Sequence, residues 1–262
     1  MGKSLIIKGA DFSEIAIPKE YVVLDWIAND SNGRTHFDTG VKPDLNKRFE
    51  LGFSLSNDIL DMTDNTPLVL YGCANTYGSY AENNGLIMGV RKHSTSAINN
   101  TIQMLGSTNY FGSNIVYSAG GKITDDGVHI LSVCPTEILL DGVQAMDGQP
   151  TGGTLETPIT NNIYLCGVSG IDPSYLKPLN GISGPGYYLI KSVHTHSFKV
   201  FANKTDTAPS MNFVPVLRTE DGKPYFYDIA NAVYVPASNN GAGVIYALNG
   251  TIYNYDGSEY SE

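Results

Sequence analysis

The sequence predicts an all-β fold, a sandwich or a barrel, on three observations. Short apolar runs recur along all 262 residues, separated by Gly, Pro, Asn and Asp, which is typical of many short strands joined by turns. Residues 48–55 alternate strictly between polar and apolar side chains, the period of a half-buried strand. Helical periodicity is scarce, and its best candidate, residues 58–62, is too short to shape the fold.

The expected strands can be placed in order along the chain. Each is an apolar run that ends near a turn residue or a proline. The runs cover residues 5–7, 48–55, 68–71, 86–90, 128–133, 137–140, 163–166, 187–193, 198–201, 213–217, 225–227 and 233–235. The polar residues 194–197 are expected to separate two strands, and residues 173–185 to form a loop.

The strongest turn signal is Asp141-Gly142, which follows the run 137–140. Both residues tolerate positive φ, as a two-residue hairpin loop requires. Asp228 and Asn231 indicate a second tight hairpin turn, in which their side chains bond to the local backbone.

Composition and charge exclude some classes of partner. The net charge is −10 and only 16% of residues are charged. Since nucleic-acid binders show a basic patch and the sequence has no Lys/Arg cluster, we expect no nucleic-acid binding. No apolar run approaches the ~20 residues that span a bilayer. Lys8 interrupts the short apolar run near the start, so we expect neither a signal peptide nor membrane insertion.

The three cysteines, Cys73, Cys134 and Cys166, are odd in number and widely spaced. The chain has no C-x-x-C motif, so the pattern favours buried free thiols over a disulfide framework or a zinc site. We therefore expect the protein to be made in a reducing compartment.

Three stretches, in order along residues 18–247, carry a family resemblance. They are Glu20-Tyr21-Val22 with His36-Phe37-Asp38-Thr39-Gly40 and 48–55; Gly127-Val128-His129-Ile130 through Asp141-Gly142; and Phe213-Val214-Pro215-Val216-Leu217-Arg218 with Tyr227-Asp228-Ile229-Ala230-Asn231-Ala232-Val233-Tyr234. Together they resemble the concanavalin A-like (laminin-G-like) lectin and glucanase domains of gut bacterial and phage proteins. The resemblance implies a jelly-roll β-sandwich of two antiparallel sheets over residues 18–247. Residues 1–17 would then be an N-terminal docking extension, and residues 248–262 an acidic, tyrosine-rich tail.

The first residues point to a setting for such a domain. Residues 4–13 resemble the N-termini of these domains in Bacteroides-associated phage and prophage proteins. This implies a non-enzymatic virion protein, made in the host cytoplasm: a head or tail fibre, tip or decoration subunit for adhesion. Its partners would be other virion proteins or a host surface glycan. Fibre proteins are commonly trimeric, so we expect a homotrimer in which the docking extension can add a strand to a neighbour.

Two alternatives remain open from the sequence. One is a bacterial carbohydrate-binding protein at the cell surface, and the less favoured one is a glycoside hydrolase. Glycosidases on this kind of sandwich place paired carboxylates on one strand face. Asp58, Asp61 and Asp64 are three residues apart, which does not match a strand, and Glu137 is near only the turn residue Asp141. We therefore predict no catalytic residues.

Metal binding has weak support in the sequence. His194 and His196 alternate and could face the same way, but no third ligand at a recognisable spacing is nearby; surface histidines are the simpler interpretation. Many relatives of this fold bind calcium at a loop edge, so calcium stays possible at 58–64 or 124–127. We expect no other cofactor.

Tyrosine-rich loops are the best candidate for glycan binding. An aromatic ring can stack on a sugar while its polar end and nearby amides bond to hydroxyls. Tyr77, Tyr80 and Asn83 share one loop, and Tyr110 is expected in another. The alternative is an ordinary tyrosine-rich rim. Trp26, the one tryptophan, is expected to pack in the core or at a sheet edge.

Overall fold

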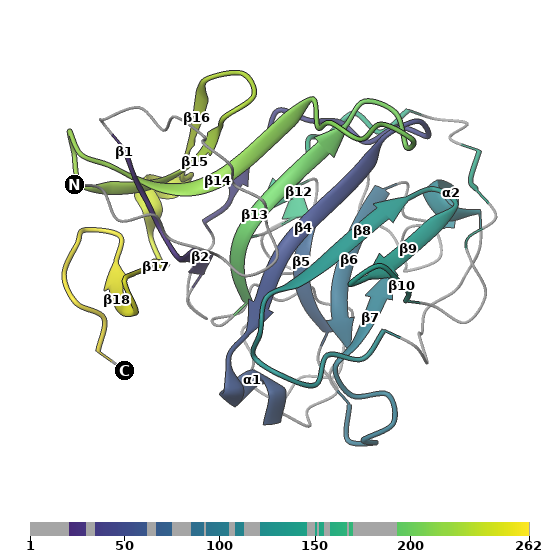
Figure 1. The fold of residues 1–262 in the computed structure, drawn as a ribbon, viewed down its shortest axis with the longest axis horizontal. Helices are drawn as coiled ribbons and strands as arrows, with labels where there is room; N and C mark the ends of the chain where they lie inside the picture. The colour runs from purple at the N-terminus through teal and green to yellow at the C-terminus, as the bar shows by residue number, and fades with distance from the viewer. Residues whose placement is uncertain are drawn as a thin grey trace.

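The chain forms two β-sheets that pack face to face, and neither described sheet closes into a barrel. The computed structural model describes residues 21–29, 35–61, 67–74, 85–91, 93–104, 108–112, 121–145, 150, 152–154, 158–166, 168–169 and 193–261. Figure 1 shows the larger sheet in front of the smaller one. The predicted all-β sandwich is confirmed.

The larger sheet holds twelve described strands. They are β1 (Tyr21–Val23), β2 (Trp26–Asn29), β4 (Arg48–Leu55), β8 (His129–Cys134), β9 (Glu137–Leu140), β10 (Val143–Gln144), β13 (Val193–Phe201), β14 (Met211–Arg218), β15 (Lys223–Asp228), β16 (Val233–Pro236), β17 (Val244–Leu248) and β18 (Thr251–Asn254). The main path runs β10-β9-β8-β4-β13-β14-β15-β16, so β10 and β16 are edge strands of this path.

The smaller sheet holds six described strands and packs behind the first. They are β3 (Phe37–Asp38), β5 (Pro67–Ala74), β6 (Gly85–Arg91), β7 (Thr101–Met104), β11 (Tyr164–Leu165) and β12 (Val168–Ser169). Its order is β3-β11-β5-β6-β7, with β12 parallel to β5 and the other pairs antiparallel. The described helices are short: α1 (Asn57–Asp61), α2 (Thr108–Phe111) and the 3-10 turn η2 (Asn239–Gly241). Within these ranges, none has the length and apolar character that crossing a bilayer requires.

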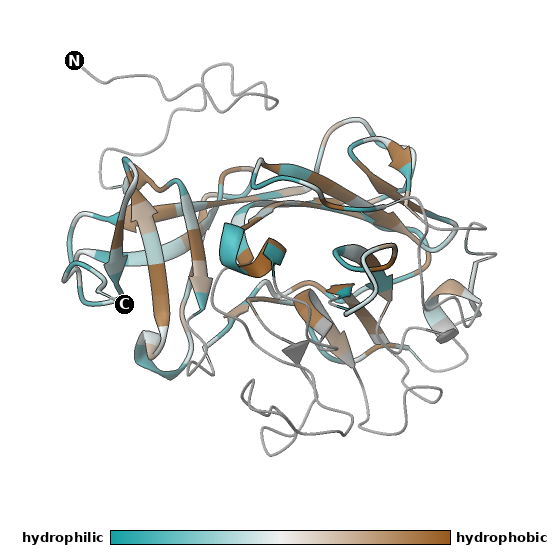
Figure 2. Cartoon of the chain, turned by 90° about the horizontal axis from the view of Figure 1, so that it is seen from below, coloured by the Kyte–Doolittle hydropathy of each residue, from teal (hydrophilic) through white to brown (hydrophobic). Residues whose placement is uncertain are grey.

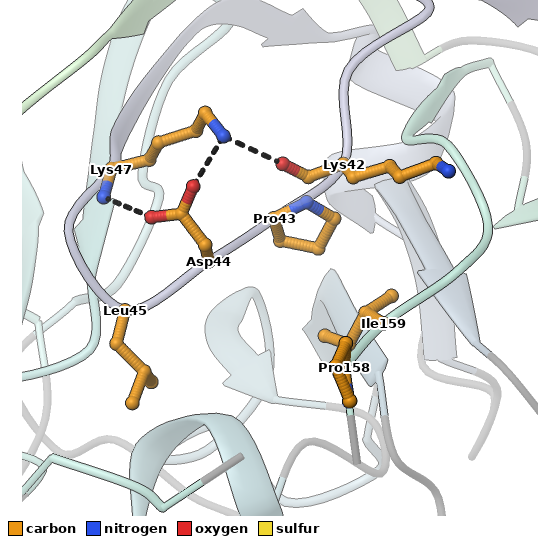
Figure 3. Close-up of a pocket in the computed structure, with 7 residues that line it drawn as sticks. All are labelled: Lys42, Pro43, Asp44, Leu45, Lys47, Pro158 and Ile159. Carbon is orange, nitrogen blue, oxygen red and sulfur yellow. Dashed lines mark hydrogen bonds and ion pairs between the residues drawn. The ribbon is translucent and has the colours of Figure 1, made fainter.

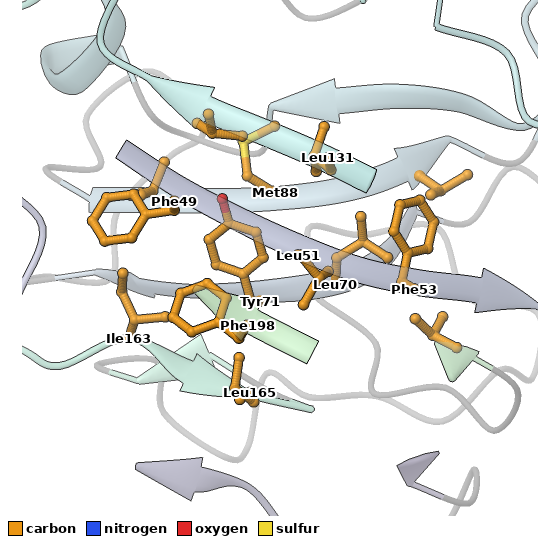
Figure 4. Packing of buried hydrophobic residues seen from close by; sticks show 14 of the residues in the cluster. Phe49, Leu51, Phe53, Leu70, Tyr71, Met88, Leu131, Ile163, Leu165 and Phe198 are labelled. Carbon is orange, nitrogen blue, oxygen red and sulfur yellow. The ribbon is translucent and has the colours of Figure 1, made fainter. Parts of the chain in front are cut away.

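The core lies between the sheets and is built from alternate residues of the central strands. Phe49, Leu51 and Phe53 of β4 are fully buried, as the strict alternation predicts. Figure 4 shows them in one cluster with Tyr71 of β5 and Phe198 of β13, whose ring centroids are 5.3 Å apart. Figure 2 shows the apolar segments distributed over both layers. Burying each large side chain contributes roughly 1.5–3 kcal/mol, so this cluster holds the two sheets together.

The larger sheet divides into two branches at β13. One side of β13 pairs with β4; the other pairs with β2 at Thr195↔Ile27 and then with β14 at Phe198–Val200. One branch is therefore β14-β15-β16, and the other is β2-β17-β18. Strand β1 pairs with β14 and turns through the corner at Leu24-Asp25 into β2, so one stretch of chain links both branches.

The predicted break at residues 194–197 is wrong. These residues continue β13 without interruption, because a bulge between Thr195 and Ser197 absorbs one extra residue. The polar run therefore stays in the ladder. The predicted strand 5–7, the loop 173–185 and most of the predicted strand 187–193 lie outside the described residues.

The C-terminal segment is described through residue 261. Residues 251–254 form β18 against β17, and Tyr253 and Glu259 are bridged beyond it. Tyr260 packs on a small buried cluster that includes Trp26 and Ile245. Through residue 261 the segment is thus paired and packed. Residues 1–17, the expected docking extension, lie outside the described residues.

Candidate binding site

The residues predicted to bind glycan do not form a described site. Tyr77, Tyr80 and Asn83 lie outside the described residues. Tyr110 lies on α2, where its ring is fully buried and packs edge-on against Phe111 at 4.9 Å. Burial raises the pKa of Tyr110 well above its usual value. The expectation of an exposed loop at Tyr110 is therefore wrong, because its ring is part of the core and offers no open face to a sugar.

An exposed aromatic group does lie at the end of the larger sheet, on the edge strand β16. Tyr234 is 44% exposed and its neighbour Val233 is 54% exposed. Tyr234 faces Tyr227 across the β15–β16 pair. Its ring also packs at a steep angle on Tyr225, with centroids 5.1 Å apart. The ring is thus held by its neighbours while much of its surface stays open.

An arginine with two carboxylate partners lies beside this ring. The Arg218 guanidinium lies 5.1 Å from the ring centroid of Tyr225 and 5.4 Å from that of Tyr234, within cation–π range. Arg218 pairs with Asp221 and lies 3.7 Å from a carboxylate oxygen of Glu220. We call Arg218, Glu220, Asp221, Tyr225 and Tyr234 the Tyr234 patch.

The hairpin turn between β14 and β15 fixes the carboxylates of the patch. The backbone N–H of Gly222, at φ +66°, bonds to the Arg218 carbonyl at 2.9 Å. The Tyr225 hydroxyl donates to Asp221 at 2.7 Å. Partial burial acts to raise the pKa of Asp221, but the bonds from Arg218 and Tyr225 outweigh it and hold this pKa at about 2. Asp221 is therefore ionised at neutral pH, and Glu220, whose side chain is 78% exposed, lies open to solvent.

The Tyr234 patch can bind a ligand in two ways. A partly open tyrosine ring stacks on a sugar or packs against a protein, and the adjacent guanidinium and carboxylates bond to polar groups. Sequence reasoning missed this site because residues 233–235 form an apolar run, which predicts burial. Only Val235 of the three is buried. These residues are exposed because β16 is an edge strand, and the strand order cannot be inferred from the apolar run alone.

A second group of polar side chains lies where β2, β4 and β13 meet. The Trp26 and His194 rings are stacked, with centroids 3.7 Å apart and planes 1° from parallel. The Ser54 hydroxyl lies 2.9 Å from Nε2 of His196 and 3.4 Å from Nδ1 of His194. We call Trp26, Ser54, His194 and His196 the histidine cluster. The two histidines do face the same way, as their alternation suggested, but they are half-buried rather than surface residues.

A serine beside a histidine raises the question of nucleophilic catalysis. Burial, with a further contribution from His196, lowers the pKa of His194 to about 4, and burial lowers that of His196 to about 4 as well. A general base works best when its pKa is near the working pH, so these imidazoles are weak bases at neutral pH. Ser54 is also buried, so a substrate has little access to its hydroxyl.

Two carboxylates of the segment 124–127, which was considered for calcium, are used in local bonds. Asp125 accepts from the backbone N–H of Gly127 at 2.9 Å, and Asp126 accepts from the Asn57 side-chain amide at 3.3 Å. The turn residue Asp141, weighed for catalysis, accepts from His129 and from the backbone N–H of Ile130, both at 2.8 Å. Within the described ranges, no three His, Cys, Asp or Glu side chains are grouped so that they could hold a metal ion. The pair His194 and His196 has no described third ligand.

A shallow hollow of about 370 Å³ lies beside the loop that leads into β4. Pro43, Leu45, Pro158 and Ile159 give it an apolar floor (Figure 3). At its rim, the Lys47 ammonium bonds to the Asp44 carboxylate and, at 3.2 Å, to the carbonyl of residue 42. The described lining has no aromatic ring on which a sugar could stack, so the Tyr234 patch is the stronger candidate for recognition.

Comparison of the chain with protein-family models, with curated proteins and with solved structures found no match.

Proposed function

We propose that this chain is a non-enzymatic adhesion module of a phage virion, a fibre, tip or decoration subunit. In this proposal the Tyr234 patch binds a partner protein of the virion or a host surface glycan. The observation that carries it is the 44% exposed ring of Tyr234, held by Tyr225 and Arg218 on paired strands. A recognition surface on strands is more precise than one on loops.

The assembly belongs to the same proposal. Edge strands leave backbone N–H and C=O groups unpaired, and such edges accept a further strand. Strand β16 is an edge of the main path, bridged to β3 just past its end at Phe37↔Ala237, and it bears Val233 and Tyr234 at the start of that edge. A homotrimer in which neighbouring subunits contact one another beside this edge fits a fibre or tip protein, and it places the Tyr234 patch at a subunit boundary.

Binding measurements with a matched pair of variants test the proposal. We expect Tyr234→Ala to weaken binding roughly tenfold or more, since a central aromatic contact is worth about 2 kcal/mol. Val143→Ala removes a side chain that is 65% exposed at the opposite edge of the sheet, and should leave binding unchanged. The probes are intact gut bacterial cells, an array of their surface polysaccharides, and virion proteins separated from particles.

The probes distinguish the proposal from its alternatives. Binding of the wild-type monomer to purified polysaccharide, combined with no binding to any of the separated virion proteins, favours a bacterial carbohydrate-binding protein. Release of reducing sugar from the array favours a glycoside hydrolase. Equal binding by wild type and Tyr234→Ala to every probe that the wild type binds contradicts the role of the Tyr234 patch.

A further inference from the structure

The branch β2-β17-β18 has little backbone attachment to the main sheet. Among the described strand pairs, β2 and β13 share one registered pair, Thr195↔Ile27. By contrast, β13 pairs with β4 over eight registered residue pairs. Side-chain contacts therefore have a large share in holding the branch in place, and they include those of Ile27, Val244 and Tyr246, which are buried in the main core.

The histidine cluster supplies further contacts across the β2–β13 boundary. Trp26 of β2 stacks on His194 of β13, and Ser54 of β4 bonds to His196 of β13. His196 also hydrogen-bonds to the backbone of Asp25, at the corner that leads into β2. The two rings thus connect three strands and the corner.

We propose that the histidine cluster is an acid-sensitive latch: its neutral rings fasten β2 and the β17–β18 hairpin to the main sheet, and their protonation releases them. A neutral His196 accepts a hydrogen bond at Nε2 from the Ser54 hydroxyl, while its other nitrogen bonds to the Asp25 backbone. Once both rings are protonated, no ring nitrogen can accept, so the Ser54 hydroxyl must turn and accept from the rings, and two positive charges lie close together in a half-buried site.

Few charges face the cluster from the part of the chain that the structure describes. Strands β2 and β17 contain no charged residue. The Asp25 carboxylate acts on His196 and opposes release by attracting its proton, but burial outweighs it. Farther along the sheet, Glu50 of β4 faces Lys199 of β13 in the register, and Glu50 is also 3.6 Å from Arg48. Glu50 offsets one of these two positive charges.

The direction of the pH effect follows from the lowered pKa values. Because both folded pKa values lie near 4 and the usual value is 6.5, the unfolded or released form binds more protons between these limits. Stability rises with pH wherever that is so. The stabilisation that the latch gives to the attached branch is therefore fully present above pH 6.5 and is lost progressively as the pH falls toward 4.

Trp26 provides a direct readout because it is the one tryptophan in the chain. Its fluorescence responds to protonation of the stacked His194 and to exposure of the ring to water. For the wild-type protein we expect reversible quenching and a red shift as the pH falls from 6.5 to 4, while the far-UV circular dichroism of the main sheets is retained. A flat fluorescence signal over this range overturns the latch, as does a transition that coincides with loss of the circular dichroism.

Three variants assign the transition to the cluster. His194→Phe keeps an aromatic stack without a titrating group, and His196→Gln keeps a polar group near Ser54; each should weaken the transition, and the double variant should abolish it. His36→Phe is the matched control, because His36 is also a stacked ring, 3.8 Å from Tyr164, in another part of the molecule. An unchanged transition in the double variant, or a loss of equal size in the control, contradicts the proposal.

A measurement on the wild type alone covers the case in which a variant fails to fold. Proton NMR of the imidazole C–H groups follows each histidine against pH in the intact protein. The latch is supported if two rings titrate well below pH 6.5. It also requires that amide exchange in β2 and β17 at pH 5 is faster than the intrinsic pH dependence of amide exchange predicts from the rate at neutral pH. Five histidines that all titrate near 6.5 rule it out.

Discussion

Asp228 shows how one short side chain fixes a hairpin. It is 2% exposed, and its carboxylate accepts from the backbone N–H groups of Asn212 at 2.8 Å and Ala230 at 3.0 Å. The Asn231 amide donates to its second oxygen at 2.6 Å. The sequence predicted the bonds to the local backbone from the Asp-x-x-Asn spacing. It did not predict the bond to Asn212, which belongs to a different strand.

Replacing Asp228 tests this network. Asp228→Ala removes the buried acceptor of two backbone N–H groups, that of Asn212 on β14 and that of Ala230 in the turn, and bonds to a charged group are worth about 1.5–3 kcal/mol each. We expect the free energy of unfolding, from urea titration, to fall by roughly 2–4 kcal/mol. Asp61→Ala, at an exposed carboxylate on α1, is the control and should change it by less than about 0.5 kcal/mol. Equal effects of the two changes contradict the assigned role.

At the scale of elements, the hairpin at Asp141-Gly142 and strand β4 were predictable from the sequence. Asp141 and Gly142 have φ of +52° and +78°, and Leu140 pairs with Val143 across a two-residue loop. In β4, however, only the inward face follows the prediction. Ser54 was expected to be wet and is buried, because His194 and His196 lie against it. Those neighbours are about 140 residues away in the chain, beyond the reach of a local pattern.

Glycine is needed at Gly72 and at Gly142 for different reasons, lack of space at the first and a positive φ at the second. A Cβ on Gly72 would lie 2.6 Å from the Leu86 carbonyl oxygen and 2.8 Å from Cα of Ile87, so β5 and β6 would have to move apart. A Cβ on Gly142 meets nothing within 4 Å, but its positive φ disfavours side chains.

Alanine and asparagine substitutions distinguish the two cases. At Gly142 we expect Ala to cost about 1 kcal/mol and Asn to cost less, since Asn tolerates positive φ. At Gly72 we expect Ala to cost roughly 1–3 kcal/mol and the larger Asn to cost more, since the obstacle is space. Thermal or urea unfolding measures all four variants. A gain in stability from Ala to Asn at Gly72 contradicts the close approach of β5 and β6.

At the scale of the whole molecule, the two-layer sandwich was predictable and its branching was not. The period-two runs require a sheet with one buried face, and two such sheets bury their apolar faces against each other. The division at β13 depends on long-range partners, such as Ile27 for Thr195. The candidate site follows the same rule. Arg218 and Tyr234 belong to separate strands, and only the pairing of β14, β15 and β16 brings them together.

The functional proposal also belongs to this scale, since a fibre or tip subunit acts only within a particle. An adhesion module requires a rigid frame, an open recognition surface and an edge for assembly. The sandwich core, the Tyr234 patch and the edge strand β16 match these three requirements. The central claim of this proposal is therefore that the chain is a structural subunit of a virion.

Quantitative mass spectrometry of density-gradient-purified particles from the source culture tests that claim most directly. The account predicts that peptides of this chain, such as those spanning β13 to β15, band with the particles. It also predicts a fixed ratio to the major capsid protein and a copy number divisible by three. If the chain is abundant in the infected-cell lysate but missing from the particle band, it is not a virion subunit and the account is contradicted.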